Sequence, residues 1–80
     1  MKNSIDLHGL TIDRGYNKSL CFIKIAYMNK IPWIKIITGR SGKMNSEFEK
    51  WASNPSFKPY IDRIKWCDNY GAWLIKFKSN

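Results

Sequence analysis

The feature that most restricts the fold of this chain is a long stretch with helical spacing between two short stretches with strand character. Between positions 11 and 30, apolar side chains recur every three or four residues and form one stripe of an amphipathic helix: Ile12, Tyr16, Leu20, Ile23 and Tyr27. Before it, Ile5 and Leu7 alternate with Asp6 and His8, and after it the segment 31–38 is rich in β-branched residues. A strand, a helix and a second strand in this order predict a right-handed βαβ unit with parallel strands.

The remaining sequence predicts one more helix and two more strands. Positions 39–43 (Gly-Arg-Ser-Gly-Lys) indicate a glycine-rich turn, and Ser46 followed by Glu49 predicts a capping box that starts a short helix. Strand patterns then cover 61–67 and 72–78 and are joined by a hairpin turn. The order βαβαββ predicts an α/β (α+β) two-layer sandwich, in which two helices cover one face of a mixed four-stranded sheet.

The charge of the chain favours a polyanionic partner. Fourteen Lys and Arg residues against six Asp and Glu residues give a net charge of +8. Because strand side chains alternate, the face of the sheet away from the helices is expected to collect cations with Asp6 and His8: Lys35, Arg63, Lys65, Lys76 and Lys78. Trp33, Ile37 and Leu74 share that face, where they can stack on bases or support a protein contact. We therefore expect a nucleic acid as partner, and the alternative is a basic surface without one.

Several classes of protein are excluded by simple counts. No run of apolar residues is long enough for a transmembrane helix, and the first residues lack the apolar segment of a signal peptide. We therefore expect a cytoplasmic protein without a membrane partner, in which Cys21 and Cys67 are reduced thiols. One histidine and two scattered cysteines do not make a zinc site within a monomer. We expect no small-molecule cofactor, and Mg²⁺ stays possible.

The best candidate site is the end of the first strand, where Asp6 and His8 stand beside the glycine-rich turn. Ligands of parallel βαβ units bind outside the carboxyl ends of adjacent strands. Backbone N–H groups of a glycine-rich turn and nearby cations can bind a phosphate, and the following helix start adds its dipole. The predicted nucleic-acid-binding residues are Lys35, Thr38, Gly39, Arg40, Ser41, Gly42 and Lys43. The alternative is that Asp6 only caps the next turn and His8 is an ordinary surface residue.

A P-loop is excluded by the spacing of the same turn. Gly39 precedes Gly42 by three positions where the P-loop requires five, and Met44 stands where it requires Ser or Thr.

Two motifs of this chain resemble those of the Smr (small MutS-related) domain family. Residues 5–11 (Ile-Asp-Leu-His-Gly-Leu-Thr) are similar to its Leu-Asp-x-His-Gly-x-Thr motif, and residues 36–42 (Ile-Ile-Thr-Gly-Arg-Ser-Gly) to its Ile-x-Thr-Gly-x-Gly motif. Tyr70-Gly71-Ala72 is similar to the glycine-rich end before its last strand. The resemblance covers nearly the whole chain, so that residues 1–80 are expected to form one Smr-like domain. The second loop glycine is displaced, since Ser41 stands where the family has glycine.

The resemblance implies a fold and a function. The fold is a two-layer sandwich like the C-terminal domain of a bacterial translation initiation factor, with strand order 1-2-4-3. The function is binding to DNA or RNA, often with nicking endonuclease activity. The acid and the histidine of the first motif map onto Asp6 and His8, and the Thr-Gly loop maps onto Thr38 and Gly39.

We therefore expect a small basic nucleic-acid-binding domain that nicks DNA or RNA by hydrolysing phosphodiester bonds. His8 is the expected general base or acid, and Asp6 is expected to orient it, to hold a water or to hold Mg²⁺. RNA cleavage can use the 2′-OH as nucleophile without a metal, whereas DNA nicking needs a water and favours Mg²⁺. The displaced loop glycine motivates the alternative of a non-catalytic adaptor for nucleic acid or the ribosome. A protein-interaction domain is the third class.

Overall fold

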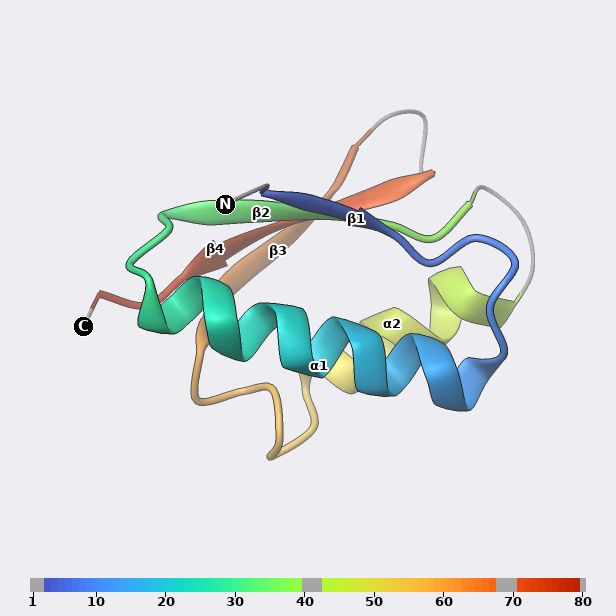
Figure 1. The fold of residues 1–80 in the computed structure, drawn as a ribbon, viewed down its shortest axis with the longest axis horizontal. Helices are drawn as coiled ribbons and strands as arrows, with labels where there is room; N and C mark the ends of the chain where they lie inside the picture. The colour runs from blue at the N-terminus through green and yellow to red at the C-terminus, as the bar shows by residue number, and fades with distance from the viewer. Residues whose placement is uncertain (1–2, 40–42, 68–70, 80) are drawn as a thin grey trace.

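A sheet with both helices on one of its faces forms the architecture of the chain in the computed structural model, which describes residues 3–39, 43–67 and 71–79 (Figure 1). In chain order the elements are β1 (Ser4–Asp6), α1 (Ile12–Met28), β2 (Trp33–Ile37), α2 (Lys43–Ala52), β3 (Ile61–Cys67) and β4 (Ala72–Phe77). The strand order is β1-β2-β4-β3. β1 pairs with β2 in parallel, and the other two pairings are antiparallel. The predicted α+β sandwich, its βαβαββ order and its strand order are confirmed.

Helix α1 begins where the sequence predicts, because Thr11 caps it. The Thr11 hydroxyl accepts a hydrogen bond from the Arg14 N–H group at 3.2 Å, and Asp13 adds an acid to the first turn. The buried face of α1 carries two small residues in its first half, Gly15 and Ser19. A Cβ added at Gly15 would lie 2.6 Å from the Met44 sulfur of α2. The two helices therefore approach each other closely at a position that only glycine fills without displacing a neighbour.

The core lies between the helices and the inner face of the sheet. Alternate residues of the two central strands point into it, as predicted, and are almost completely buried: Ile34, Ile36, Trp73, Ile75 and Phe77. The helical layer adds Ile23 and Phe48, and the segment after α2 adds Phe57. Trp66 of β3 packs edge-on against Trp73 at a ring separation of 5.0 Å, yet it stays 41% exposed. β3 is an edge strand, so Trp66 has a neighbouring strand on one side only.

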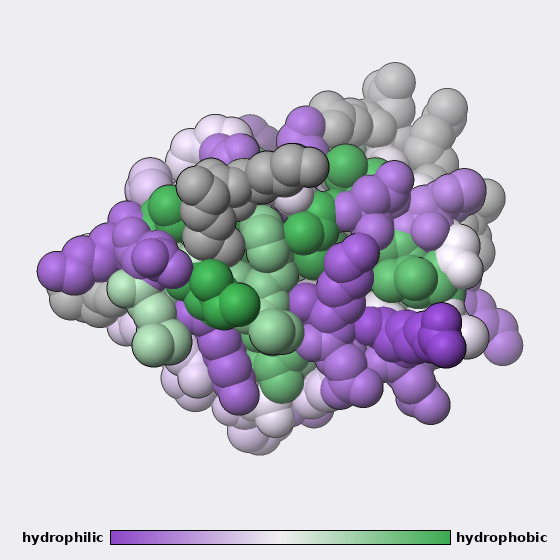
Figure 2. Space-filling model, viewed as in Figure 1, coloured by the Kyte–Doolittle hydropathy of each residue, from purple (hydrophilic) through white to green (hydrophobic). Residues whose placement is uncertain are grey.

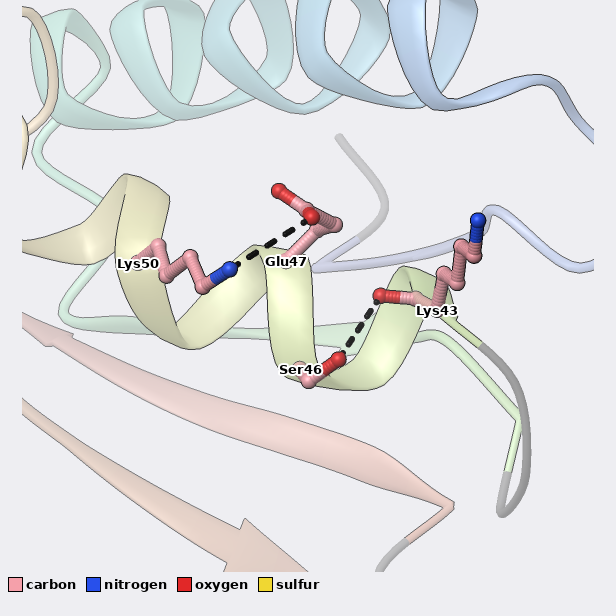
Figure 3. A network of polar contacts seen from close by, with 4 residues as sticks. All are labelled: Lys43, Ser46, Glu47 and Lys50. Atoms are coloured by element: carbon pink, nitrogen blue, oxygen red, sulfur yellow. Dashed lines mark hydrogen bonds and ion pairs between the residues drawn. The ribbon is translucent and has the colours of Figure 1, made fainter.

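The start of α2 differs from the prediction. The helix begins at Lys43, three positions before Ser46, so Ser46 lies within the first turn and the predicted capping box is wrong. The Ser46 hydroxyl donates a hydrogen bond to the Lys43 carbonyl oxygen at 3.2 Å, and Lys50 pairs with Glu47 at 3.7 Å one turn later (Figure 3). Exposed pairs of this kind contribute little to stability. Neither helix in the described part of the chain has the length and apolar character needed to cross a bilayer.

The close approach of the helices predicts an energetic coupling between Gly15 and Met44. In the wild-type background, Gly15→Ala gains helix propensity but pushes against Met44, whereas in a Met44→Ala background the added methyl group has room. We expect the change that Gly15→Ala makes in the free energy of unfolding to be more stabilising in the Met44→Ala background by about 1 kcal/mol. Urea unfolding of the two single variants and the double variant measures this coupling. Additive effects would contradict the close contact.

Candidate nucleic-acid and catalytic site

The parallel pairing of β1 and β2 brings their carboxyl ends to the same end of the sheet. Asp6 is the register partner of Ile37, and the Leu7 N–H group donates to the Ile37 carbonyl oxygen at 2.7 Å, one residue beyond β1. The segments that follow β1 and β2 both leave the sheet at the end where α2 begins (Figure 1). We call the residues gathered there the rim: Asp6, His8, Thr38, Gly39 and Lys43.

The first part of the rim is a tight turn with two exposed polar side chains. The Asp6 Oδ1 atom accepts a hydrogen bond from the backbone N–H group of His8 at 2.8 Å, and the Leu10 N–H group donates to the Leu7 carbonyl oxygen at 3.1 Å. Gly9 has a φ of 83°, in the region that favours glycine. Leu7 is fully buried between Asp6 and His8, which are both exposed. Asp6 thus caps the turn, as the simpler alternative predicts, and it holds the backbone of His8 rather than the imidazole ring.

The second part of the rim is tied to the start of β4. The N–H groups of Thr38 and Gly39 both donate to the Gly71 carbonyl oxygen, at 3.1 and 2.9 Å. The Thr38 side chain is 3% exposed. These two N–H groups are therefore already hydrogen-bonded, and they hold the segment after β2 beside Gly71. That Thr38 and Gly39 bind nucleic acid stays a prediction. Of the other predicted residues, Lys43 is exposed, and Arg40, Ser41 and Gly42 lie outside the described residues.

Asn45 is a positioning residue that the sequence reasoning misses. Its Nδ2 atom donates to the Thr38 hydroxyl oxygen at 3.1 Å and lies 3.2 Å from the Gly39 carbonyl oxygen. The Thr38 hydroxyl in turn donates to the Gly39 carbonyl oxygen at 3.2 Å. Asn45 is 9% exposed, so α2 anchors the end of β2 through a buried polar contact. No local sequence pattern predicts this role, because it depends on the tertiary contact of α2 with Thr38 and Gly39.

Lys18 is a second residue that was missed, and it comes from the middle of α1. An open cavity of about 560 Å³ lies beside β1, and Asp6 and Lys18 are among the residues that line it. The rest of the lining is Asn3, Ser4, Ile5 and Ile37. The signal in the sequence is the spacing of Arg14 and Lys18, four residues apart on one exposed helix face. Lys18 brings a cation to the same cavity as the candidate catalytic acid.

The face of the sheet away from the helices carries the predicted cations. We call it the open face and define it by the outward residues of three strands: Trp33, Lys35, Ile37, Arg63, Lys65, Leu74 and Lys76. Arg63, Lys65 and Lys76 are exposed and Lys35 is half-buried, whereas Ile34, Ile36 and Ile75 between them are fully buried. The predicted outward placement of these cations is confirmed.

The acids of the described residues do not form a preformed metal site. No three His, Cys, Asp or Glu side chains come together within 3–39, 43–67 and 71–79. Asp6 offers one carboxylate at the rim, and Mg²⁺ is commonly bound by one or two carboxylates together with substrate phosphates and waters. Asp6 is therefore the residue that would hold a Mg²⁺ ion brought in with a nucleic acid.

The φ angle of Gly9 predicts a backbone effect that does not depend on crowding. A Cβ added at Gly9 meets no atom within 4 Å, so the cost of Gly9→Ala comes from the left-handed backbone alone. We expect Gly9→Ala to lower the free energy of unfolding by about 1–2 kcal/mol. Gly9→Asn is the matched variant, because Asn adopts this conformation more easily, and it should cost less. Urea titrations compare the two, and an alanine variant as stable as the wild type would contradict the turn.

The contacts of Asn45 predict a loss of stability when its amide is removed. Asn45→Ala leaves buried oxygen atoms of Thr38 and Gly39 without this donor, which costs about 1–3 kcal/mol. Asn17→Ala, an exposed change on α1, is the control and should stay within about 0.5 kcal/mol of the wild type. Chemical unfolding measures both variants. Equal stabilities would show that Asn45 does not anchor the turn.

The fold is shared with solved structures, although no known family model and no curated protein sequence matches this chain at a significant level. The Smr domain of Thermus thermophilus MutS2 superposes with a TM-score of 0.86 at 12% identity, over 99% of this chain and 100% of that one. YdaL, a stand-alone small MutS-related protein from Escherichia coli, gives a TM-score of 0.76 at 14% identity, over 96% of this chain and 65% of that one. The chain therefore has the fold of an Smr domain.

Proposed function

We propose that this domain binds nucleic acid and cuts its phosphodiester bonds at the rim, as a nicking endonuclease. The observation that carries the proposal is an exposed carboxylate and an exposed imidazole at the carboxyl end of β1, beside the turn that follows β2. The net charge of +8 and the cations of the open face support a polyanionic substrate. The fold of an Smr domain agrees with a role on nucleic acid.

His8 is the proposed general base. With RNA, its ring accepts the proton of the 2′-OH group as the 2′-oxygen attacks phosphorus, and the bond from phosphorus to the 5′-oxygen breaks. The products are a 2′,3′-cyclic phosphate and a 5′-hydroxyl, which takes up a proton. With DNA, a water molecule replaces the 2′-OH group, and its oxygen is added to phosphorus as the ester bond breaks. His8 is exposed and so can reach either nucleophile.

Asp6 and two lysines complete the proposed chemistry. The hydrogen bond from the His8 N–H group to Asp6 fixes the backbone of His8, so Asp6 positions the base through the main chain. Lys18 shares the cavity of Asp6, and Lys43 starts α2 at the rim. Their charges support binding of the scissile phosphate and stabilise the negative charge that develops on it. When Mg²⁺ is bound, it supplies Lewis-acid activation of the phosphate or the water.

The test of the catalytic proposal is the variant His8→Ala. We expect cleavage to fall by about 100-fold or more, because proton transfer by a positioned side chain contributes that much, while binding changes little. Cleavage is measured on supercoiled plasmid and on labelled RNA, with and without Mg²⁺, and binding is measured by fluorescence anisotropy. His8→Gln is the matched variant, which keeps a polar side chain but cannot transfer the proton, and it should be as inactive as His8→Ala.

Two results would decide against cleavage at His8. Full activity in His8→Ala would remove the imidazole from the mechanism. Salt-sensitive binding by the wild type, without cleavage under any metal condition, would identify the domain as a non-catalytic adaptor.

A further inference from the structure

We propose that the open face binds single-stranded nucleic acid, with Trp33 as the platform on which a base stacks. The proposal rests on the proposed function, since it names the form of the substrate and the path by which it reaches the rim. It is carried by the composition and register of the open face, which are independent of the chemistry of His8.

Trp33 is an exposed aromatic residue surrounded by cations. It is the first residue of β2, and its side chain is 42% exposed on the outward side of the strand. Its register partner is Lys76 of β4, and the partner of Lys76 on β3 is Arg63. An indole ring and two cationic side chains thus form one row across the open face. Such a row offers a flat ring to a base and positive charge to the phosphates beside it.

The next row combines two cations with an aliphatic side chain. Lys35 of β2 pairs with Leu74 of β4, which pairs with Lys65 of β3. Leu74 and Ile37 are half-buried, so apolar surface lies between the cations. The acids of this region stand at its borders, with Asp62 3.5 Å from the Arg63 guanidinium group and Asp6 at the rim. The open face is therefore a cationic surface with an apolar and aromatic centre.

A single strand fits this surface better than a duplex does. In a duplex the bases are stacked on one another, and only their edges are accessible in the grooves. A single strand exposes the faces of its bases, and stacking on an aromatic side chain accepts any base. The four-stranded face also lacks a projecting helix that could enter a major groove, because both helices cover the opposite side of the sheet (Figure 1). An acidic protein would satisfy the charge but would not need the exposed indole ring.

The open face leads to the rim along β2. Trp33 and Ile37 are four residues apart on this strand, which corresponds to about 13 Å at the usual rise. Ile37 is the register partner of Asp6. A single-stranded nucleic acid with one base stacked on Trp33 and its backbone along β2 would therefore present a phosphate to Asp6 and His8. The same path passes Lys35, the residue between Trp33 and Ile37 on this face.

The experiment compares two tryptophans of equal exposure on opposite sides of the sheet. Trp33→Ala removes the ring from the open face, and Trp66→Ala removes the 41% exposed ring that packs on Trp73 on the helix side. Anisotropy measures the affinity of each for a labelled single-stranded DNA, an RNA of the same sequence and the DNA duplex. We expect the wild type to bind the single strands more tightly than the duplex. The affinity of Trp33→Ala for the single strands should be about 5- to 150-fold lower than that of the wild type. Trp66→Ala should keep the wild-type affinity, and the affinity of Trp33→Phe should lie between those of the wild type and Trp33→Ala.

A lysine pair provides a readout that does not depend on the fold of the tryptophan variants. Lys65→Gln changes the open face, and Lys24→Gln makes the same change on the exposed side of α1. If Lys65 contacts a phosphate, the slope of log affinity against log salt should fall by about 0.7 in Lys65→Gln only. The proposal is supported if Trp33→Ala lowers the affinity and Trp66→Ala does not, and if Lys65→Gln lowers the salt slope and Lys24→Gln does not.

Each other outcome overturns it in a recognisable way. Equal affinity of Trp33→Ala and Trp66→Ala, with plasmid or RNA still cut in a His8-dependent manner, would refute the stacking platform and leave the proposed function standing. Displacement of the oligonucleotide by a poly-glutamate peptide whose own binding requires Trp33 would point to an acidic protein as the partner. Absence of binding to any of the three nucleic acids at low salt would refute both proposals.

Discussion

The hydrogen bond from the Leu7 N–H group to the Ile37 carbonyl oxygen is the contact on which the arrangement of the site depends. β1 is only three residues long, and this bond extends its pairing with β2 beyond Asp6. Leu7 is fully buried, so the chain is held on the core side at the same residue. Asp6 and His8 flank Leu7 and are therefore turned to solvent, beside the end of β2. Without this contact the pairing of β1 with β2 would end at Asp6, one residue before the turn that carries His8.

The second half of the site is held from two other directions. Gly71, at the start of β4, accepts hydrogen bonds from Thr38 and Gly39, and Asn45 of α2 donates to the Thr38 hydroxyl oxygen. These contacts give the Thr-Gly segment a structural role, because they hold the end of β2 beside Gly71 and beside the first turn of α2. The carbonyl oxygen of Gly71 bonds both residues and so links this segment to the residue before the last strand. In the proposed function, phosphate binding is therefore assigned to side-chain cations such as Lys18 and Lys43.

The sequence predicted what depends on local periodicity. The apolar stripe of α1 and the strand patterns of β2 and β4 are each encoded within a few residues, and each is present in the structure. The start of α2 was missed because Ser46 can satisfy its hydroxyl within a helix as well as at a cap, and the sequence does not distinguish the two. Asn45 and Lys18 were missed because their roles arise from tertiary contacts. The exposure of Trp66 depends on β3 lying at the edge of the sheet, and the alternation of residues along a strand does not predict the position of that strand in the sheet.

The position of β2 in the middle of the sheet has a consequence for any nucleic acid that lies along it. β2 is bonded to β1 on one side and to β4 on the other, so the separation between Trp33 and Ile37 cannot stretch or shorten. A base anchored at one end of this strand and a scissile bond at the other would be kept at a constant interval. The domain would then act as a ruler, and its cleavage products would be offset by a uniform number of nucleotides from the anchored base.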